Sequence, residues 1–160
     1  MFKKFVIVYD HRVDIKYIDK VKAYLNEQNI EYLAVEDTGE ANDYPVLASK
    51  AYDLYLTSKA DGMILLCGTG VGMSMVANKF AGIRAVLPNE EGLAYFARRD
   101  EDANAIVFAA GKADENYEVK LCKRKMIRIL DVFIKTEFMG EERHRRRIGQ
   151  MAQIEKVGRI

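Results

Sequence analysis

The sequence contains no tryptophan, two prolines and two cysteines in 160 residues, and its charges nearly cancel. The two cysteines, Cys67 and Cys122, lie in unlike surroundings without metal-ligand spacing, so we expect free thiols rather than a disulfide framework or a zinc site. There are 25 lysine and arginine residues and 24 aspartate and glutamate residues, for a net charge of +1. This balance argues against a nucleic-acid partner and against an acidic, solvating tail.

Long apolar runs are also absent. Residues 1–8 lack the apolar region of a signal peptide, and no run approaches the roughly 18 residues that a membrane span needs. We therefore expect a cytoplasmic protein without a membrane partner. A length of 160 residues suits one domain with a substantial core and is too short for two ordinary ones. We expect residues 1–160 to form that single domain.

Short apolar runs alternate with longer amphipathic segments along the chain, which is the pattern of βα units. Strands are predicted over residues 5–9, 31–35, 62–67, 83–87 and 105–109. Helices are predicted over residues 15–25, 46–58, 71–80, 91–99 and about 118–135. This order predicts an α/β, Rossmann-like three-layer sandwich with a five-stranded, mostly parallel sheet, in which ligands bind beyond the carboxyl ends of strands. The apolar stripe of the last helix places Cys122 in the core.

Residues 61–74 carry the strongest functional signal. A buried strand ends at Cys67, and the glycines that follow allow a tight turn and close ligand approach before the next helix; they are Gly68, Gly70 and Gly72. The helix N-terminus at this turn can hold an anion and lower a thiol pKa from about 8.5. A tight turn without function is the simpler interpretation of the glycines alone. Nucleotide-binding fingerprints are not met, because Met73 replaces the required small residue and no Gly-Lys-Ser/Thr follows.

Further motifs surround this turn in a fixed order. They are Asp10-His11, Asp43-Tyr44-Pro45, Cys67 to Ser74, Ala77-Asn78-Lys79, Gly82-Ile83-Arg84-Ala85, Asp102-Ala103-Asn104, Thr136-Glu137-Phe138, Arg143-His144 and Arg147. Together they resemble the family of sugar-phosphate isomerases that contains ribose-5-phosphate isomerase B and galactose-6-phosphate isomerase. The resemblance covers nearly the whole chain.

The resemblance implies an aldose-ketose isomerase that acts on a pentose or hexose phosphate through an enediolate, with no metal and no cofactor. Cys67 would be the base that carries a proton between C1 and C2. Thr69 and the backbone N-H groups of the turn would hold the developing oxyanion. The substrate-binding set that the resemblance implies is Asp10, His11, Tyr44, Gly68, Gly70, Val71, Gly72, Glu101, Arg143 and Arg147. Taken singly, Asp10 fits a helix cap, His11 a surface loop and Tyr44 ordinary packing.

The segment after Gly140 carries the local positive charge. Arg143 and Arg147 are four residues apart, so they share a helix face and can bind a phosphate through paired guanidinium N-H donors. In the family, such arginines reach the site of a neighbouring subunit, which implies a homodimer or dimer of dimers with an arm over about residues 137–160. A solvated charged face and a nucleic-acid patch are the alternatives. The patch is short and the chain nearly neutral, which argues against nucleic acid.

Two departures from the family pattern are adjacent. Asp100 stands where ribose-phosphate members have a ring-opening histidine, and Glu101 replaces an asparagine that contacts the sugar. A carboxyl with an ordinary pKa of about 3.9 is a poor acid at neutral pH unless burial raises that value. These departures leave open a partner-dependent subunit of a heteromeric isomerase and a sugar-phosphate-binding protein without turnover. Residues 113–117 also lack the family's usual glycine-containing turn, which predicts a reshaped rim.

Overall fold

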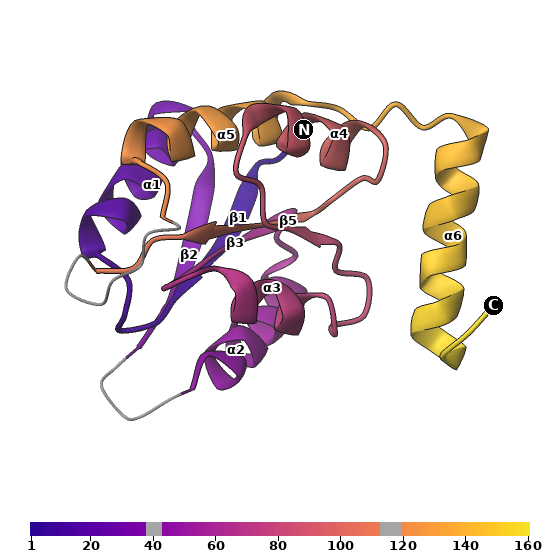
Figure 1. The fold of residues 1–160 in the computed structure, drawn as a ribbon, viewed down its shortest axis with the longest axis horizontal. Helices are drawn as coiled ribbons and strands as arrows, with labels where there is room; N and C mark the ends of the chain where they lie inside the picture. The colour runs from indigo at the N-terminus through magenta and orange to yellow at the C-terminus, as the bar shows by residue number, and fades with distance from the viewer. Residues whose placement is uncertain (38–42, 113–119) are drawn as a thin grey trace.

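The computed structural model describes residues 1–37, 43–112 and 120–160. A five-stranded sheet lies between two layers of helices, with strand order β2-β1-β3-β5-β4 (Figure 1). The strands are β1 (Lys4–Tyr9), β2 (Glu31–Glu36), β3 (Gly62–Cys67), β4 (Ala85–Val86) and β5 (Ala105–Ala109). Each pair of neighbouring strands is parallel. The predicted α/β, Rossmann-like sandwich is therefore confirmed.

Helices cover both faces of the sheet (Figure 1). One face carries α1 (Ile15–Glu27), α4 (Glu91–Arg99) and α5 (Lys123–Lys135), and the other carries α2 (Tyr44–Ser58) and α3 (Val71–Ala77). A sixth helix, α6 (Glu142–Val157), stands beside the sandwich near the edge strand β4. None of the described helices is both long enough and apolar enough to cross a lipid bilayer.

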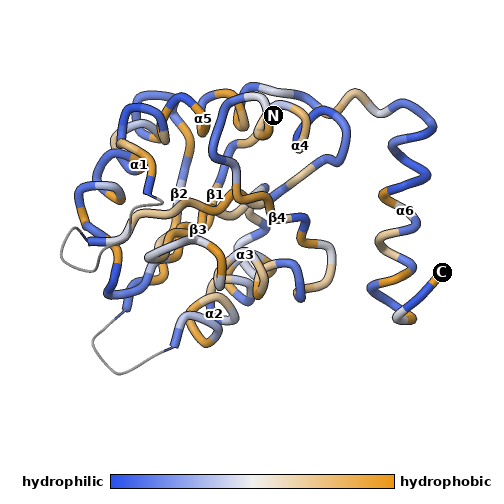
Figure 2. Tube along the Cα trace, in the orientation of Figure 1, coloured by the Kyte–Doolittle hydropathy of each residue, from blue (hydrophilic) through white to orange (hydrophobic). Residues whose placement is uncertain are grey.

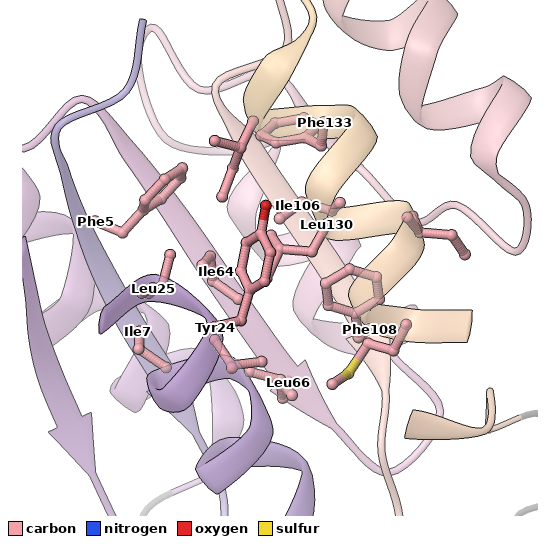
Figure 3. Packing of buried hydrophobic residues seen from close by; sticks show 14 of the residues in the cluster. Phe5, Ile7, Tyr24, Leu25, Ile64, Leu66, Ile106, Phe108, Leu130 and Phe133 are labelled. Carbon is pink, nitrogen blue, oxygen red and sulfur yellow. The ribbon is translucent and has the colours of Figure 1, made fainter. Parts of the chain in front are cut away.

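The sheet is apolar on both faces because helices cover both. In β1, Phe5 and Ile7 pack into one buried cluster, while Val6 and Val8 pack into the other. Figure 3 shows the first cluster, where residues of β1, β3 and β5 meet those of α1 and α5. Figure 2 shows apolar residues concentrated along the strands. This two-sided burial holds the carboxyl ends of the central strands in fixed positions.

The helix α6 is largely exposed. All its residues are described, and His144 is the one that is buried. The far end of α6 contacts the sandwich through Glu155, whose carboxylate accepts a hydrogen bond of 2.7 Å from the backbone N-H of Gly82. Between α6 and β4 lies a groove of about 660 Å³, lined in part by Ile148, Met151 and Ile154.

Several element boundaries differ from the sequence predictions. The helix expected from about residue 118 begins at Lys123, while residues 120–122 are not helical and 113–119 lie outside the described residues. Cys122 is the exposed residue before α5, so its assignment to the core is wrong. Leu121 contacts the core in its place, and its carbonyl accepts a hydrogen bond from the Tyr17 hydroxyl.

Two other predicted elements are shorter in the structure. The strand expected over residues 83–87 is reduced to Ala85–Val86. The helix expected over residues 71–80 ends at Ala77, because the side chain of Asn78 bonds to both Ser74 and Ala85 and turns the chain back toward β4. The predicted reshaping of the rim at residues 113–117 lies outside the described residues.

Candidate active site

The carboxyl ends of β1 and β3 bring Asp10 and Cys67 together. These strands are neighbours, and Tyr9 pairs with Leu66, so the next residues along each strand lie side by side. Asp10 is 5% exposed and Cys67 is 6% exposed. A buried carboxyl and a buried thiol at the ligand-binding edge of a parallel sheet form a candidate reaction centre.

The glycine turn curls around the sulfur of Cys67. The backbone N-H of Gly70 donates a hydrogen bond of 3.1 Å to the Cys67 Sγ. Gly70 has a φ of +78°, a left-handed conformation that favours glycine. The hydroxyl oxygen of Thr69 accepts a 3.3 Å hydrogen bond from the backbone N-H of Val71, which begins α3. The turn therefore presents backbone N-H groups next to the thiol.

Burial raises the pKa of the Cys67 thiol above its ordinary value. The backbone N-H groups of Met73, Gly70 and Thr69 act in the opposite direction, and the charge of Asp10 raises the pKa further. The expectation that this turn lowers the thiol pKa is therefore wrong for the chain without ligand. The N-H groups do stabilise the thiolate, but the loss of water around the sulfur outweighs them.

Asp10 is the second group with a perturbed pKa. Burial raises the pKa of its carboxyl, and a hydrogen bond of 3.0 Å from the backbone N-H of Arg12 opposes this effect. Asp10 does not cap the following helix, because Asp14 occupies that position and bonds the N-H of Lys16. Its carboxyl is thus held at the strand end beside Cys67.

Replacing Asp10 with asparagine should make Cys67 easier to deprotonate. Removing a negative charge next to a thiolate lowers the pKa of the thiol, so the pH midpoint for alkylation of Cys67 should fall and its rate at pH 7 should rise. The measurement is the iodoacetamide reaction rate against pH in a Cys122→Ala background, where Cys67 is the remaining thiol. Asp53→Asn, at an exposed position on α2, is the control. An unchanged or higher midpoint in Asp10→Asn contradicts the coupling.

His11 and Tyr44 lie at the same edge of the sheet. The exposed His11 places its Nδ1 3.0 Å from an Oδ2 of Asp37, the residue that follows β2. Tyr44 begins α2, and its ring lies against the glycine turn: a Cβ added to Gly72 would come within 2.7 Å of the Tyr44 Cζ. The structure therefore brings these two side chains to the edge that carries Cys67. Asp37 has no assigned role from the sequence, and its place just after a strand is the signal that points to it.

Asp100 and Glu101 lie at the opposite edge of the sheet. The helix α4 runs from the end of β4 back to the start of β5, so the residues that follow it reach the amino ends of the strands. Asp100 is the C-cap residue of α4, and the exposed Glu101 comes next. Within one chain, neither residue meets Cys67.

The arginines of α6 lie with Asp100 rather than with Cys67. Arg143 and Arg147 are exposed on the first turns of α6, as the helical spacing predicts. The Nε of Arg143 lies 2.8 Å from the Glu141 Oε2 and donates a 3.1 Å hydrogen bond to the Nε2 of His144. The candidate residues thus form two sets on opposite edges, one around Cys67 and one around Asp100 and the start of α6.

Comparisons with known proteins identify the family. The sequence profile described as Ribose/Galactose Isomerase matches residues 5–151. The chain belongs to this family. The matched range runs from β1 into α6 and includes both sets of candidate residues, and it confirms the resemblance drawn from the sequence motifs.

Relatives with names and structures support the family assignment. Ribose-5-phosphate isomerase B of Escherichia coli is 36% identical over 141 residues, which cover 86% of this chain and 87% of that protein. A crystal structure of a ribose 5-phosphate isomerase from Thermotoga maritima is 35% identical, with a TM-score of 0.80 over 94% of this chain and 97% of that one. The type B ribose 5-phosphate isomerase of Trypanosoma cruzi is 30% identical, with a TM-score of 0.83 over 99% of both chains.

Proposed function

We propose that this chain is an aldose-ketose isomerase of the ribose-5-phosphate isomerase B type, which interconverts ribose 5-phosphate and ribulose 5-phosphate or a related pair of sugar phosphates. The single observation that carries the proposal is the buried Cys67 inside the glycine turn, at the carboxyl edge of the sheet, in a chain of this family. The thiol accepts a hydrogen bond from the backbone N-H of Gly70, and the buried carboxyl of Asp10 is close enough for its charge to act on the thiol.

The proposed reaction moves one proton between C2 and C1 and one between O2 and O1, and it leaves the carbon chain intact. The Cys67 thiolate takes the proton from C2 of the open-chain aldose, the C-H electron pair forms the C1-C2 double bond, and the carbonyl oxygen O1 becomes an oxyanion. Thr69 and the N-H groups of the turn stabilise that charge. The hydroxyl proton of O2 then passes to O1, the thiol returns its proton to C1, and O2 becomes the carbonyl oxygen of the ketose. Since burial raises the pKa of Cys67, turnover should increase with pH as the thiolate fraction grows.

A complete site requires a second subunit in this proposal. Asp100, Arg143 and Arg147 lie on the opposite edge from Cys67, so we infer that a homodimer joins one set of residues to the other set of its partner. Apolar side chains exposed on α6 support such an interface; they are Met151, Ile154 and Val157. The groove beside β4 offers a surface against which a second copy of the chain can pack.

A heteromeric isomerase is the second candidate. The observation in its favour is the pair Asp100 and Glu101, which add negative charge where a phosphorylated ligand would approach. In that case another chain would supply the acid for ring opening, and this chain alone would bind sugar phosphates without converting them. A binding protein that has lost turnover would give the same result in the absence of a partner.

The test is turnover by the purified chain on a panel of pentose and hexose phosphates that begins with ribose 5-phosphate, alongside binding titrations with the same sugars. We expect conversion of at least one aldose phosphate to its ketose. Binding without any conversion would contradict a self-sufficient isomerase and support the heteromeric or binding-only alternatives. Absence of both binding and conversion would contradict a sugar-phosphate site altogether.

Gly72→Ala should weaken substrate binding because the new methyl group would push the Tyr44 ring out of its position in the proposed sugar site. We expect KM to rise on the order of tenfold, which corresponds to about 1.4 kcal/mol. Gly92→Ala is the matched control: Gly92 is the second residue of α4 as Gly72 is of α3, and a Cβ there meets no atom of the described residues within 4 Å. Equal KM values in the two variants would contradict a role for Tyr44 in binding.

A further inference from the structure

The buried side chain of His144 lies next to that of Asp100. His144 is 2% exposed, and its Nδ1 is 3.8 Å from the Asp100 Oδ1. That nitrogen has no hydrogen-bond partner within the described part of the chain. The ring is held in place by the first turn of α6 and by Phe138, whose ring centroid is 6.5 Å away. A buried imidazole nitrogen that faces a partly exposed carboxylate and has no hydrogen-bond partner among the described residues requires a physical explanation.

The other ring nitrogen determines where the proton resides. The Nε-H of Arg143 donates to the Nε2 of His144 at 3.1 Å, so Nε2 acts as an acceptor and carries no hydrogen. The neutral imidazole therefore holds its proton on Nδ1, where it faces Asp100. Arg143 is itself placed by Glu141, whose carboxylate lies 2.8 Å from the same Nε.

Among the described residues, the side chains that face the Asp100 carboxylate approach one of its two oxygens. Both Arg99, with its Nε at 2.7 Å, and His144, with its Nδ1 at 3.8 Å, face the same oxygen, Oδ1. Among the described residues, no side chain bonds to Oδ2. The side chain of Asp100 is 24% exposed, so this second oxygen can face a ligand that approaches from outside the chain.

We propose that Asp100 and His144 form a pair that opens the sugar ring, with Asp100 as the group that contacts the cyclic sugar in the partner's site and His144 as its positioning residue. The inference rests on the proposed isomerase function and assigns the ring-opening step of that reaction. Arg99 donates a hydrogen bond to Oδ1 and His144 faces the same oxygen at 3.8 Å, so Oδ2 is presented in a defined direction, which is what proton transfer requires.

The proton balance of the step is simple. Asp100 takes the proton from the anomeric hydroxyl O1, the C1-O1 bond becomes a carbonyl, and the C1-O4 bond of the furanose ring breaks. The electron pair of that bond remains on O4, which takes the proton back from the Asp100 carboxyl. The carboxylate is regenerated, and the open-chain aldehyde passes to Cys67. A group that receives and returns the same proton has no need of a pKa near neutrality, so an aspartate can perform this step.

The test separates ring opening from the enediolate step. Ribose 5-phosphate is largely a closed furanose, whereas ribulose 5-phosphate cannot close a five-membered ring because its O5 carries the phosphate. We expect His144→Leu to lower kcat for ribose 5-phosphate on the order of tenfold with little change in KM. The same variant should still exchange the C1 proton of ribulose 5-phosphate with solvent at close to the wild-type rate. His144→Asn should recover much of the turnover, since an asparagine amide can place an N-H near the position of Nδ1.

Different failures of this experiment have different meanings. Equal losses of turnover and exchange in His144→Leu, or no loss of either, would overturn the pair and leave the isomerase proposal standing. A wild-type chain that exchanges no proton of ribulose 5-phosphate would overturn the isomerase proposal and the pair with it. Thermal unfolding of each variant separates these results from a loss of folded protein.

A second readout addresses the pair directly. The chain has two histidines, His11 and His144, so the ring ¹⁵N signals of labelled protein can be assigned with one His11 variant. We expect His144 to carry its proton on Nδ1, and we expect Asp100→Asn to shift the Nδ1 signal because the facing charge is lost. A proton on Nε2, or signals that do not move in Asp100→Asn, would overturn the pair.

Discussion

Cys67→Ala should abolish isomerisation while leaving the binding of sugar phosphates close to that of the wild type. The proposed proton transfer between C2 and C1 of the substrate requires a base. Removal of such a base reduces turnover by about 10²-fold to 10⁴-fold. Alanine at this position removes the sulfur but leaves the N-H groups of the turn in place, so the binding site should persist. Steady-state turnover and a binding titration with the same sugar phosphate measure the two effects.

The second cysteine provides the control for this experiment. Cys122 is exposed just before α5 and has no place in the proposed reaction, so Cys122→Ala should keep wild-type turnover. Wild-type turnover in Cys67→Ala would remove the thiol from the mechanism. Loss of both binding and turnover would instead indicate a structural role for Cys67 in the turn.

Mixing two defective variants should restore activity if the site is shared between subunits. The first variant is Cys67→Ala, and the second carries Arg143→Ala and Arg147→Ala together. Each arginine can supply charge-assisted hydrogen bonds to a phosphate, so their joint loss should lower kcat/KM on the order of a hundredfold or more. After dissociation and reassociation of an equal mixture, half of the dimers pair one variant with the other, and each contains one intact site. We therefore expect about a quarter of the wild-type activity.

The same mixture distinguishes a shared site from a site within one chain. If Cys67 and the two arginines served the same site of a single chain, every site in the mixed dimers would lack one or the other, and mixing would restore nothing. Native mass spectrometry of the mixture, in which the two variants differ in mass, is the control for the exchange of subunits. No recovery, in the presence of demonstrated exchange, would contradict the shared site.

The sequence was sufficient to predict the fold and one half of the candidate site. Apolar runs that alternate with amphipathic ones predicted a parallel sheet, because strands covered on both faces must be apolar throughout. Cys67 and the glycines after it follow one of these strands directly, so their place at the carboxyl edge required no knowledge of distant contacts. Local patterns of this kind are readable because neighbouring residues in the chain determine them.

The rest of the site depends on contacts that local patterns do not encode. The position of Asp100 opposite Cys67 follows from the path of α4 back across the sheet, and the burial of His144 follows from the packing of the first turn of α6 near that helix end. The predicted direction of the Cys67 pKa shift was wrong. The backbone N-H groups of the turn lower the pKa of the thiol, but burial of the sulfur raises it by more. Cys122 fits an apolar helical stripe in the sequence, yet α5 begins after it.

The most direct measurement of the central claim is proton exchange in deuterated water, followed by NMR, with the wild-type chain and Cys67→Ala. Ribose 5-phosphate and ribulose 5-phosphate are the first sugars of the panel. Formation of an enediolate by Cys67 predicts deuterium at C2 of the aldose or C1 of the ketose with the wild-type chain and none with Cys67→Ala. Exchange that persists at the wild-type rate in Cys67→Ala would contradict the role of Cys67 as the base, and bound sugar phosphate without exchange in the wild-type chain would contradict the enediolate itself.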